Sequence, residues 1–249
     1  IRSQVLYPIE LSVQLKKFYQ KRIILAMQES QVEGVVLRAT PFKEKDRILT
    51  LLTPDRGVMN LYVRGLSKAK PTGVSLTTPL CRGEFVFKKG RTDLYHFIDG
   101  TILDLHLPLR RSYAHLDVAG KIVQALLKTQ LPGKDSHALY QLLIAFLKHL
   151  PHAQFPKTLW TTFQIKLLKH EGLLEITQAC HTCQAPATQI VNGESRCHSC
   201  GGGLPFKKDG WETLCMLFEA RSFIPLLELE LPSSLYNGIE ACFRNHIMV

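Results

Sequence analysis

Between residues 32 and 103 the apolar positions follow a short period that is typical of β-strands separated by turns. Five segments fit this pattern: residues 32–40, 47–53, 58–64, 79–88 and 94–98. A turn at residues 54–57 separates the second from the third, and residues 65–78 are expected to form a long loop. Five short strands in roughly seventy residues predict a small Greek-key barrel of the OB type.

Beyond residue 105 the apolar positions recur every three or four residues, as on helices that bury one face. The stripes predict helices from Tyr113 to near Pro132, from Leu139 to Pro151 and from Trp160 to near Gly172. Two further helices are expected around residues 211–218 and 235–243. The fold class is therefore α+β multidomain, with an OB-fold barrel at residues 27–104 and a helical domain at residues 105–249.

Residues 1–26 differ from both regions because they show no clear hydrophobic period. They begin without Met and precede Met27. We expect Met27 to be the natural start and residues 1–26 to be an extension outside the fold. A basic arm that binds nucleic acid is the alternative, since this stretch holds five Lys and Arg against one acid.

Four of the seven cysteines form two Cys-x-x-Cys pairs, Cys180 with Cys183 and Cys197 with Cys200. Each pair can hold one tetrahedral ion from a tight turn, and two pairs complete four sulfur ligands. Between the pairs, Asn192 and Gly193 predict a hairpin turn that brings them together. We therefore predict a structural Zn2+ site in a ribbon at residues 178–205, inserted into the helical domain.

Other uses of these residues stay open. The four cysteines could form two disulfides, although nothing in the sequence indicates an oxidising compartment, or the site could have lost its metal. His181 or His198 could replace a neighbouring cysteine as ligand. Four protein ligands leave no open position for water, so a zinc site here is expected to be structural and not catalytic.

The net charge of the chain indicates which class of partner it binds. The chain carries 31 Lys and Arg against 21 Asp and Glu, a net charge of +10. A positive balance of this size points to nucleic acid or anionic surfaces. Residues 177–249 carry five basic against seven acidic residues, so the excess lies in the N-terminal two-thirds. No apolar run reaches the roughly eighteen residues that a membrane helix needs.

The basic residues of the predicted barrel gather in its connections and at strand ends, where OB folds meet single strands. An ordinary solvated rim is the alternative. The candidate nucleic-acid contacts are Arg38, Lys43, Lys45, Arg47, Arg56, Arg64, Lys68, Lys70, Lys88, Lys89 and Arg91.

Aromatic residues are interleaved with these basic residues. Two pairs share a face at period two, Phe85 with Phe87 and Tyr95 with Phe97. A barrel this small must fill its interior, so core packing is favoured over base stacking for these four. Phe42 and Tyr62 are the candidates for stacking on bases.

Catalytic motifs find little support. The acids are scattered, with Asp99 and Asp104 at a strand end and Glu228 and Glu230 in a separate segment. A metal-dependent nuclease needs several converging carboxylates. The sequence holds no phosphate-binding Gly-Lys-Ser/Thr loop and no nucleophile elbow. We therefore expect a protein that is not an enzyme.

The order of these parts resembles the RecO family of bacterial recombination mediators. The resemblance covers essentially residues 28–246 and rests on residues 32–37, 44–53, Arg56 with Gly57, 63–65 and the four-cysteine motif. It implies an OB fold and a role in recombinational DNA repair, with annealing of complementary single strands. It also implies help in loading recombinase onto strands coated by single-strand-binding protein.

The same resemblance implies single- and double-stranded DNA, RecR and the acidic C-terminal tail of the coating protein as partners, in the cytoplasm at the nucleoid. Docking such a tail needs an apolar pocket between helices with a basic rim. The candidate rim residues are Lys121, Lys128, Lys166, Lys169 and His170.

Two other classes of protein stay open. One is an RNA-binding accessory protein, since OB folds and zinc ribbons both serve RNA. The other is a non-catalytic adaptor that uses its helical bundle to hold proteins. Annealing of complementary DNA strands separates the recombination mediator from both.

Overall fold

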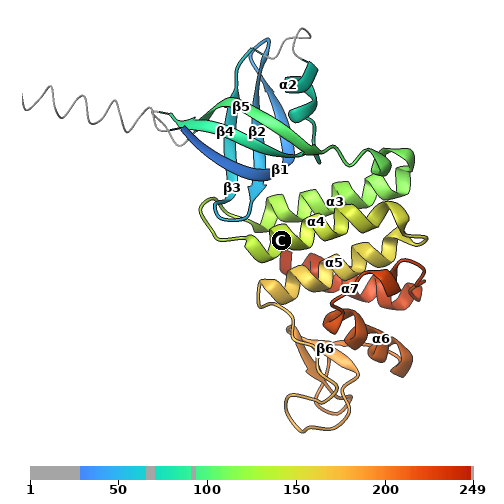
Figure 1. Cartoon of the computed structure of the whole chain (residues 1–249). Helices are drawn as coiled ribbons and strands as arrows, with labels where there is room; N and C mark the ends of the chain where they lie inside the picture. The colour runs from blue at the N-terminus through green and yellow to red at the C-terminus, as the bar shows by residue number, and fades with distance from the viewer. Residues whose placement is uncertain (1–28, 66–70, 91–93, 248–249) are drawn as a thin grey trace, which may run out of the picture. The chain divides into compact units, whose positions relative to one another are not determined.

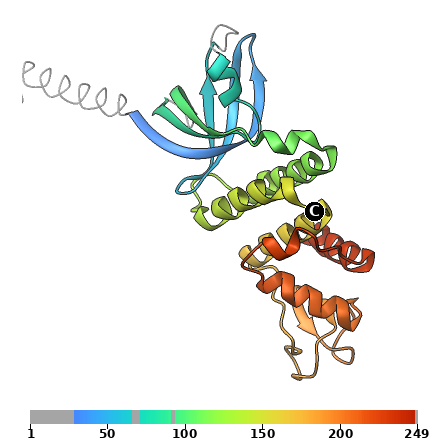
Figure 2. The same ribbon diagram turned by 45° about the vertical axis from the view of Figure 1, so that its right-hand side comes forward.

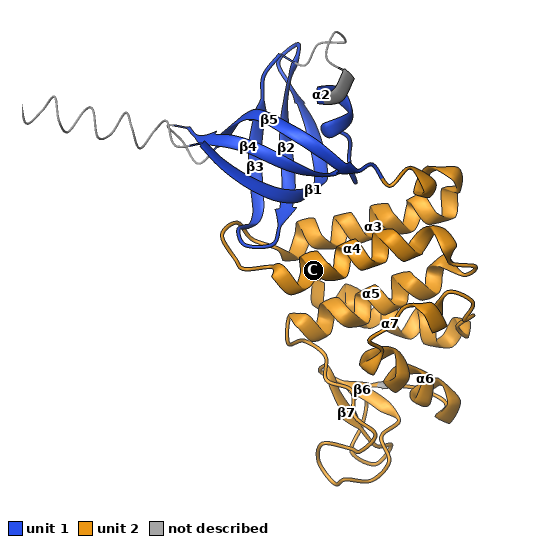
Figure 3. Cartoon of the chain, in the orientation of Figure 1, with its two compact units in different colours: residues 1–105 blue, residues 106–249 orange. Residues whose placement is uncertain are grey.

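A computed structural model of the chain describes residues 29–65, 71–90 and 94–247. The chain divides into two compact units between Leu105 and His106 (Figure 3). Residues 1–26, for which we expected an extension, lie outside the described residues.

The first unit is a closed five-stranded barrel, which confirms the predicted OB-type fold (Figure 1). Around the barrel the strands follow the order β1, β2, β3, β5, β4. β3 and β5 are parallel, and all other neighbouring strands in this order pair antiparallel. β1 pairs with both β2 and β4 and so closes the barrel. The strands are β1 (Glu29–Phe42), β2 (Asp46–Thr53), β3 (Gly57–Val63), β4 (Arg82–Lys89) and β5 (Tyr95–Asp104).

The barrel core settles the roles of the paired aromatic residues. Phe85 and Phe87 are fully buried among the aliphatic residues of β1, β2 and β3, as core packing predicts. Tyr95 and Phe97 are partly buried and pack against that core from β5. β5 also continues to Asp104, beyond the predicted end at Ile98, because the polar residues after Ile98 conceal a strand from a hydrophobic pattern.

A short helix, α2 (Pro71–Leu76), interrupts the segment that we predicted to be a loop over residues 65–78. This prediction was wrong because Pro71 and Gly73 weaken a helical signal in so short a segment. Leu76 is buried in the barrel core. It fits there because Gly83 and Gly100 have no side chains: a Cβ on either would lie 2.7 or 2.6 Å from a Leu76 methyl group.

The second unit is helical and is built around α5 (Pro156–His170), whose residues between Thr158 and Leu168 are nearly all buried. α5 contacts α3, α4, α6 and α7. Two of its buried threonines, Thr161 and Thr162, donate to carbonyl groups one turn earlier, and the third, Thr158, donates to the Leu229 carbonyl. The helices are α3 (Tyr113–Thr129), α4 (His137–His149), α5 (Pro156–His170), α6 (Lys208–Glu219) and α7 (Ser233–Ile247), with 3-10 turns at Leu107–Arg111, Leu150–His152 and Ile224–Leu226.

A small ribbon lies between α5 and α6 along the chain, as predicted for the four-cysteine segment (Figure 2). Its three strands, β6 (Gln189–Val191), β7 (Glu194–Arg196) and β8 (Leu204–Pro205), follow the order β7, β6, β8. Among the described residues, no helix has the length and apolar character that crossing a membrane requires.

Candidate nucleic-acid interface and metal centre

The four cysteines of the ribbon converge on one point. The sulfur atoms of Cys180, Cys183, Cys197 and Cys200 all lie within 4.8 Å of one another. The sulfurs of Cys183 and Cys197 are 3.5 Å apart, far beyond the roughly 2.05 Å of a disulfide bond. Zinc–sulfur bonds of about 2.3 Å place the corners of a tetrahedron about 3.8 Å apart. Donor type and spacing are therefore compatible with a tetrahedral Zn2+.

Local backbone conformation brings the two cysteine pairs together. Asn192 and Gly193 have φ angles of 51° and 83°, the left-handed values that a tight hairpin turn requires. In the turn that holds Cys180 and Cys183, the Gln184 amide donates to the Cys180 carbonyl at 3.0 Å. Neither His181 nor His198 belongs to the cluster of ligand atoms in the described part of the chain.

The electrostatics of the cluster favour a bound cation. Burial raises the pKa of the Cys180 thiol, but N–H groups of Cys183, Cys197 and Thr182 outweigh burial and lower the pKa to about 6. The neighbouring Cys183 and Cys197 raise the pKa of Cys200 to about 12, because another thiolate there would face negative sulfur. A dication removes this repulsion and lets all four sulfurs ionise.

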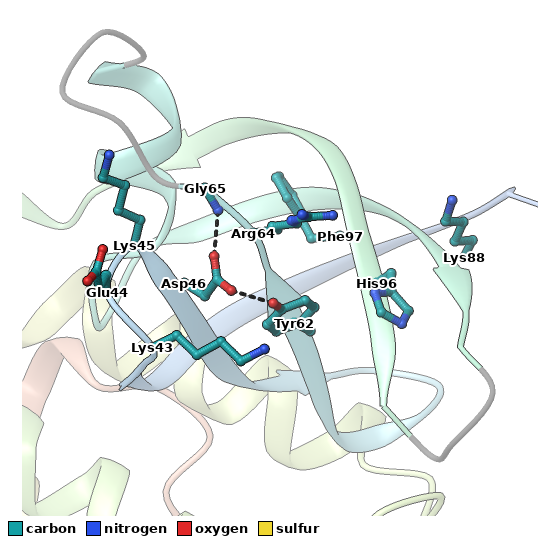
Figure 4. A pocket seen from close by; sticks show the side chains of 10 residues that line it. All are labelled: Lys43, Glu44, Lys45, Asp46, Tyr62, Arg64, Gly65, Lys88, His96 and Phe97. Carbon is teal, nitrogen blue, oxygen red and sulfur yellow. Dashed lines mark hydrogen bonds between the residues drawn. The ribbon is translucent and has the colours of Figure 1, made fainter.

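On the barrel, four of the predicted nucleic-acid contacts line one open pocket of about 890 Å³ (Figure 4). These are Lys43, Lys45, Arg64 and Lys88. The pocket lies over the start of β2 and the end of β3, beside the β1–β2 loop and the start of β5. This is the region where OB folds bind oligonucleotides, on the strand 2–3 face between the first and last loops. The remaining lining residues are Glu44, Asp46, Tyr62, Gly65, His96 and Phe97.

The strand register explains why these side chains meet. Tyr62 pairs with His96, and His96 pairs with Lys88, so the three lie in a row across β3, β5 and β4. Side chains alternate along a strand, and the neighbours Leu61 and Phe87 are buried in the core. Tyr62 and Lys88 therefore point to the outside of the barrel, on the face that carries His96.

Three aromatic rings form a row beside the basic residues. The ring centres of Phe42 and Tyr62 are 5.9 Å apart, and those of Tyr62 and His96 are 5.5 Å apart. Lys43 Nζ lies 5.5 Å from the centre of the Phe42 ring, which is 42% exposed. Aromatic faces flanked by cations are the components of single-strand binding platforms.

Four other predicted contacts, Arg38, Arg47, Arg56 and Lys89, do not line this pocket. Arg47 donates to the Thr77 hydroxyl at 3.1 Å, and Arg56 lies over the Phe87 ring at the opposite end of β3 from Arg64. Arg38 and Lys89 are exposed on β1 and β4. Lys68, Lys70 and Arg91 lie outside the residues that the structure describes.

Asp46 is a pocket residue that the sequence analysis missed. Its carboxylate accepts hydrogen bonds from the Tyr62 hydroxyl and from the Gly65 amide, the latter at 2.8 Å (Figure 4). The bond from Tyr62 lowers the pKa of Asp46 and raises the pKa of Tyr62. An acid near a turn carries no distinctive sequence signal, and only the pairing of β2 with β3 brings Asp46 to Tyr62.

The residues predicted for a partner rim lie on two helices. Lys166 and Lys169 on α5 both donate to the Phe218 carbonyl at the end of α6, at 2.7 and 3.4 Å. Lys169 also pairs with Glu219 at 3.2 Å, so these two lysines connect α5 to α6. Of the other three, Lys121 pairs with Asp117 within α3. Lys128 is exposed on α3, and His170 is exposed at the end of α5.

Lys166 is expected to give the helical unit a pH-dependent stability. Burial lowers its pKa to about 8, and the charge of Lys169 adds to this effect. A lysine whose pKa is lower in the folded than in the unfolded protein reduces the free energy of unfolding at pH values below the folded pKa. This reduction disappears as pH rises from about 8 toward the ordinary pKa of 10.5. The stability of the wild type relative to Lys166→Met should therefore increase between these two pH values. Urea unfolding of both proteins measures this difference, and a difference independent of pH would contradict the assignment.

An OB barrel with an exposed basic and aromatic pocket, followed by helices and a four-cysteine ribbon, defines a class of multidomain OB-fold proteins. The family model "Recombination protein O N terminal" matches residues 27–106. The DNA repair protein RecO of Chlamydia pneumoniae is 29% identical over 203 residues, which cover 80% of each chain. That of Chlamydia trachomatis serovar D is 26% identical over 221 residues, or 86% of this chain and 90% of the relative.

A third relative also matches this chain. The DNA repair protein RecO of Moorella thermoacetica is 31% identical over 154 residues, which cover 62% of this chain and 57% of the relative. The family model and these relatives together support the RecO family for this chain. Its homologues indicate a role in DNA repair and recombination.

Proposed function

We propose that this protein binds DNA strands in the barrel pocket and accelerates the annealing of complementary single strands during recombinational repair. The observation that carries this proposal is the convergence of Lys43, Arg64 and Lys88 around a row of three rings, the exposed Phe42 and the half-buried Tyr62 and His96. The similarity to RecO proteins supports the same class of activity.

Annealing by such a surface needs no covalent chemistry. Two complementary strands repel each other through their phosphates, and basic side chains release condensed counterions and let the strands approach. Stacking on Phe42 or Tyr62 holds bases unpaired yet available. Phosphates and stacking faces carry little sequence information, so the protein should bind with little sequence preference.

We further propose that Cys180, Cys183, Cys197 and Cys200 hold a structural Zn2+. When bound, the ion connects the two Cys-x-x-Cys pairs of the ribbon. The four thiolates fill its coordination shell, so it is expected to contribute stability and no reaction step.

The proposal includes the partners that the family resemblance implies. The protein would help load recombinase onto coated strands at the nucleoid, together with RecR and the acidic tail of single-strand-binding protein. In the helical unit, the exposed positions of Lys128 and His170 are compatible with an acidic partner. Lys166 and Lys169 would contribute less, because they already bind the end of α6.

Annealing of two labelled complementary DNA oligonucleotides tests this function. The wild-type protein should shorten the annealing time by about tenfold or more at low salt without any nucleotide cofactor, because charge repulsion limits the uncatalysed rate. Lys43→Ala/Arg64→Ala should lose most of this acceleration. Fluorescence transfer between the two labels measures the rate.

The control is Lys207→Ala/Lys208→Ala, which removes two exposed lysines near the ribbon and should anneal DNA like the wild type. Equal acceleration by the barrel variant and the wild type would refute the assignment of the surface. Faster annealing of RNA strands than of DNA strands would instead favour an RNA-binding accessory protein.

A further inference from the structure

We infer that Asp46 is a positioning residue for the DNA-binding pocket: its carboxylate fixes Tyr62 and Arg64 where they meet a base and a phosphate. The inference rests on the proposed function of this pocket. It gives a role to an acidic side chain whose charge alone would weaken DNA binding.

Asp46 occupies a central place among the groups that line the pocket. It begins β2 and pairs with Phe42 of β1 across the sheet. One carboxylate oxygen accepts the Tyr62 hydroxyl, and the other accepts the Gly65 amide at 2.8 Å. The Asp46 side chain thus connects the start of β2 to β3 at two points, Tyr62 within the strand and Gly65 two residues after its end.

These two hydrogen bonds also define the position of Arg64. On one side, Val63 is 2% exposed and anchored in the barrel core. On the other side, Gly65 has a φ of 66°, a left-handed conformation that favours glycine, and its amide is held by Asp46. The backbone of Arg64 is therefore fixed at both ends, and its guanidinium is directed to the pocket (Figure 4).

The same contacts leave only the ring of Tyr62 available to a nucleic acid base. Its hydroxyl is engaged by Asp46, so the part of Tyr62 left for a nucleic acid is the ring, between Phe42 and His96. The ligand that fits is a single strand whose base contacts this ring while its phosphates meet Lys43, Arg64 and Lys88. Asp46 itself touches no ligand in this arrangement.

Comparing the two acidic residues of the pocket separates a positioning role from a simple effect of charge. Among the described residues, Asp46 and Glu44 are the two acids that line the pocket, and either one opposes phosphate binding. Glu44 is exposed on the β1–β2 loop, whereas both oxygens of Asp46 are engaged. Removing Glu44 should therefore strengthen DNA binding, while removing Asp46 should weaken it.

The test compares Asp46→Ala with Glu44→Ala, which remove the same charge from the same pocket. Binding is measured by fluorescence anisotropy with an oligothymidylate and with an abasic strand of equal length. Glu44→Ala should bind both strands about two- to threefold more tightly. Asp46→Ala should bind the oligothymidylate about five- to tenfold more weakly, as expected for partial loss of one stacked base. For Asp46→Ala, the loss on the abasic strand should be much smaller, because that strand feels only the displaced Arg64, and removal of the negative charge offsets this displacement.

Asp46→Asn supplies the rescue. An asparagine has nearly the same shape, and it can accept from Gly65 while donating to the Tyr62 oxygen. It should restore oligothymidylate binding to the wild-type level or better, which also shows that the effect of alanine is not a loss of charge. Thermal unfolding of each variant checks that the barrel is folded.

Two outcomes would overturn the inference. One is tighter oligothymidylate binding by Asp46→Ala, equal to that of Glu44→Ala. The other is an equal loss on thymine and abasic strands. Both presuppose that the wild type binds; a wild type that bound neither strand would refute the proposed function itself.

Discussion

Replacing Cys197 with serine is expected to abolish zinc binding and to unfold the ribbon at residues 178–205. Cys197 is buried, and its sulfur lies within 4.8 Å of the other three cluster sulfurs. The ribbon strands are only two or three residues long, too short to fold on their own backbone hydrogen bonds. Structural Zn2+ contributes about 10–16 kcal/mol of binding free energy in zinc-finger peptides, so losing it removes the largest stabilising contribution here.

The measurement combines elemental analysis with limited proteolysis. Wild-type protein purified without chelator should contain about one equivalent of zinc, and Cys197→Ser less than about a tenth. The variant should be cleaved between residues 178 and 205 under conditions that leave the barrel intact, because the barrel has its own core. Strong chelators should reproduce this pattern in the wild type.

Cys215→Ala is the matched control for this experiment. Cys215 is a buried cysteine of α6 outside the cluster, so its replacement tests the loss of a thiol without loss of a ligand. It should retain the metal and the proteolytic pattern of the wild type. Wild-type protein with less than about a tenth of an equivalent of any metal and four free thiols would refute the site.

The parts of the fold that repeat a hydrophobic pattern could be predicted from the sequence. Strand alternation and helical stripes gave the barrel and five helices, since both patterns reflect burial of one face. The cysteine spacing located the ribbon, because ligand geometry constrains sequence separation directly. The helix α2 was missed because its burial depends on one residue, Leu76, and on two glycines distant in the sequence.

The pocket was only partly predictable for a related reason. Lys43, Arg64 and Lys88 stood out by charge, but their convergence depends on the pairing of β3 with β5 and of β5 with β4. Asp46 had no signal at all, because its partners lie 16 and 19 residues away along the chain. The sequence also could not show that Lys166 and Lys169 bind the end of α6.

Removing Lys43, Arg64 and Lys88 together is expected to cause the largest loss of DNA binding. The three come from the β1–β2 loop, the end of β3 and the end of β4, and they line one pocket. Each phosphate contact to a single strand contributes about 0.7 to the slope of log K against log salt. Loss of three should lower that slope by about 2 and weaken binding by one to two orders of magnitude at low salt.

A matched control removes the same charge elsewhere. Lys207, Lys208 and Arg221 are exposed residues of the helical unit, at the start of α6 and after its end. Replacing them with alanine lowers the net charge by three, as in the barrel variant. A general effect of net charge would reduce binding equally in both variants, whereas a local contact would not.

The dependence of single-strand affinity on salt concentration, compared for the wild type and these two triple variants, tests the barrel pocket most directly. We predict that the slope falls by about 2 in Lys43→Ala/Arg64→Ala/Lys88→Ala and stays at the wild-type value in Lys207→Ala/Lys208→Ala/Arg221→Ala. A barrel variant with wild-type slope and affinity, beside a control variant that has lost both, would place the DNA-binding surface in the helical unit and contradict the proposed site.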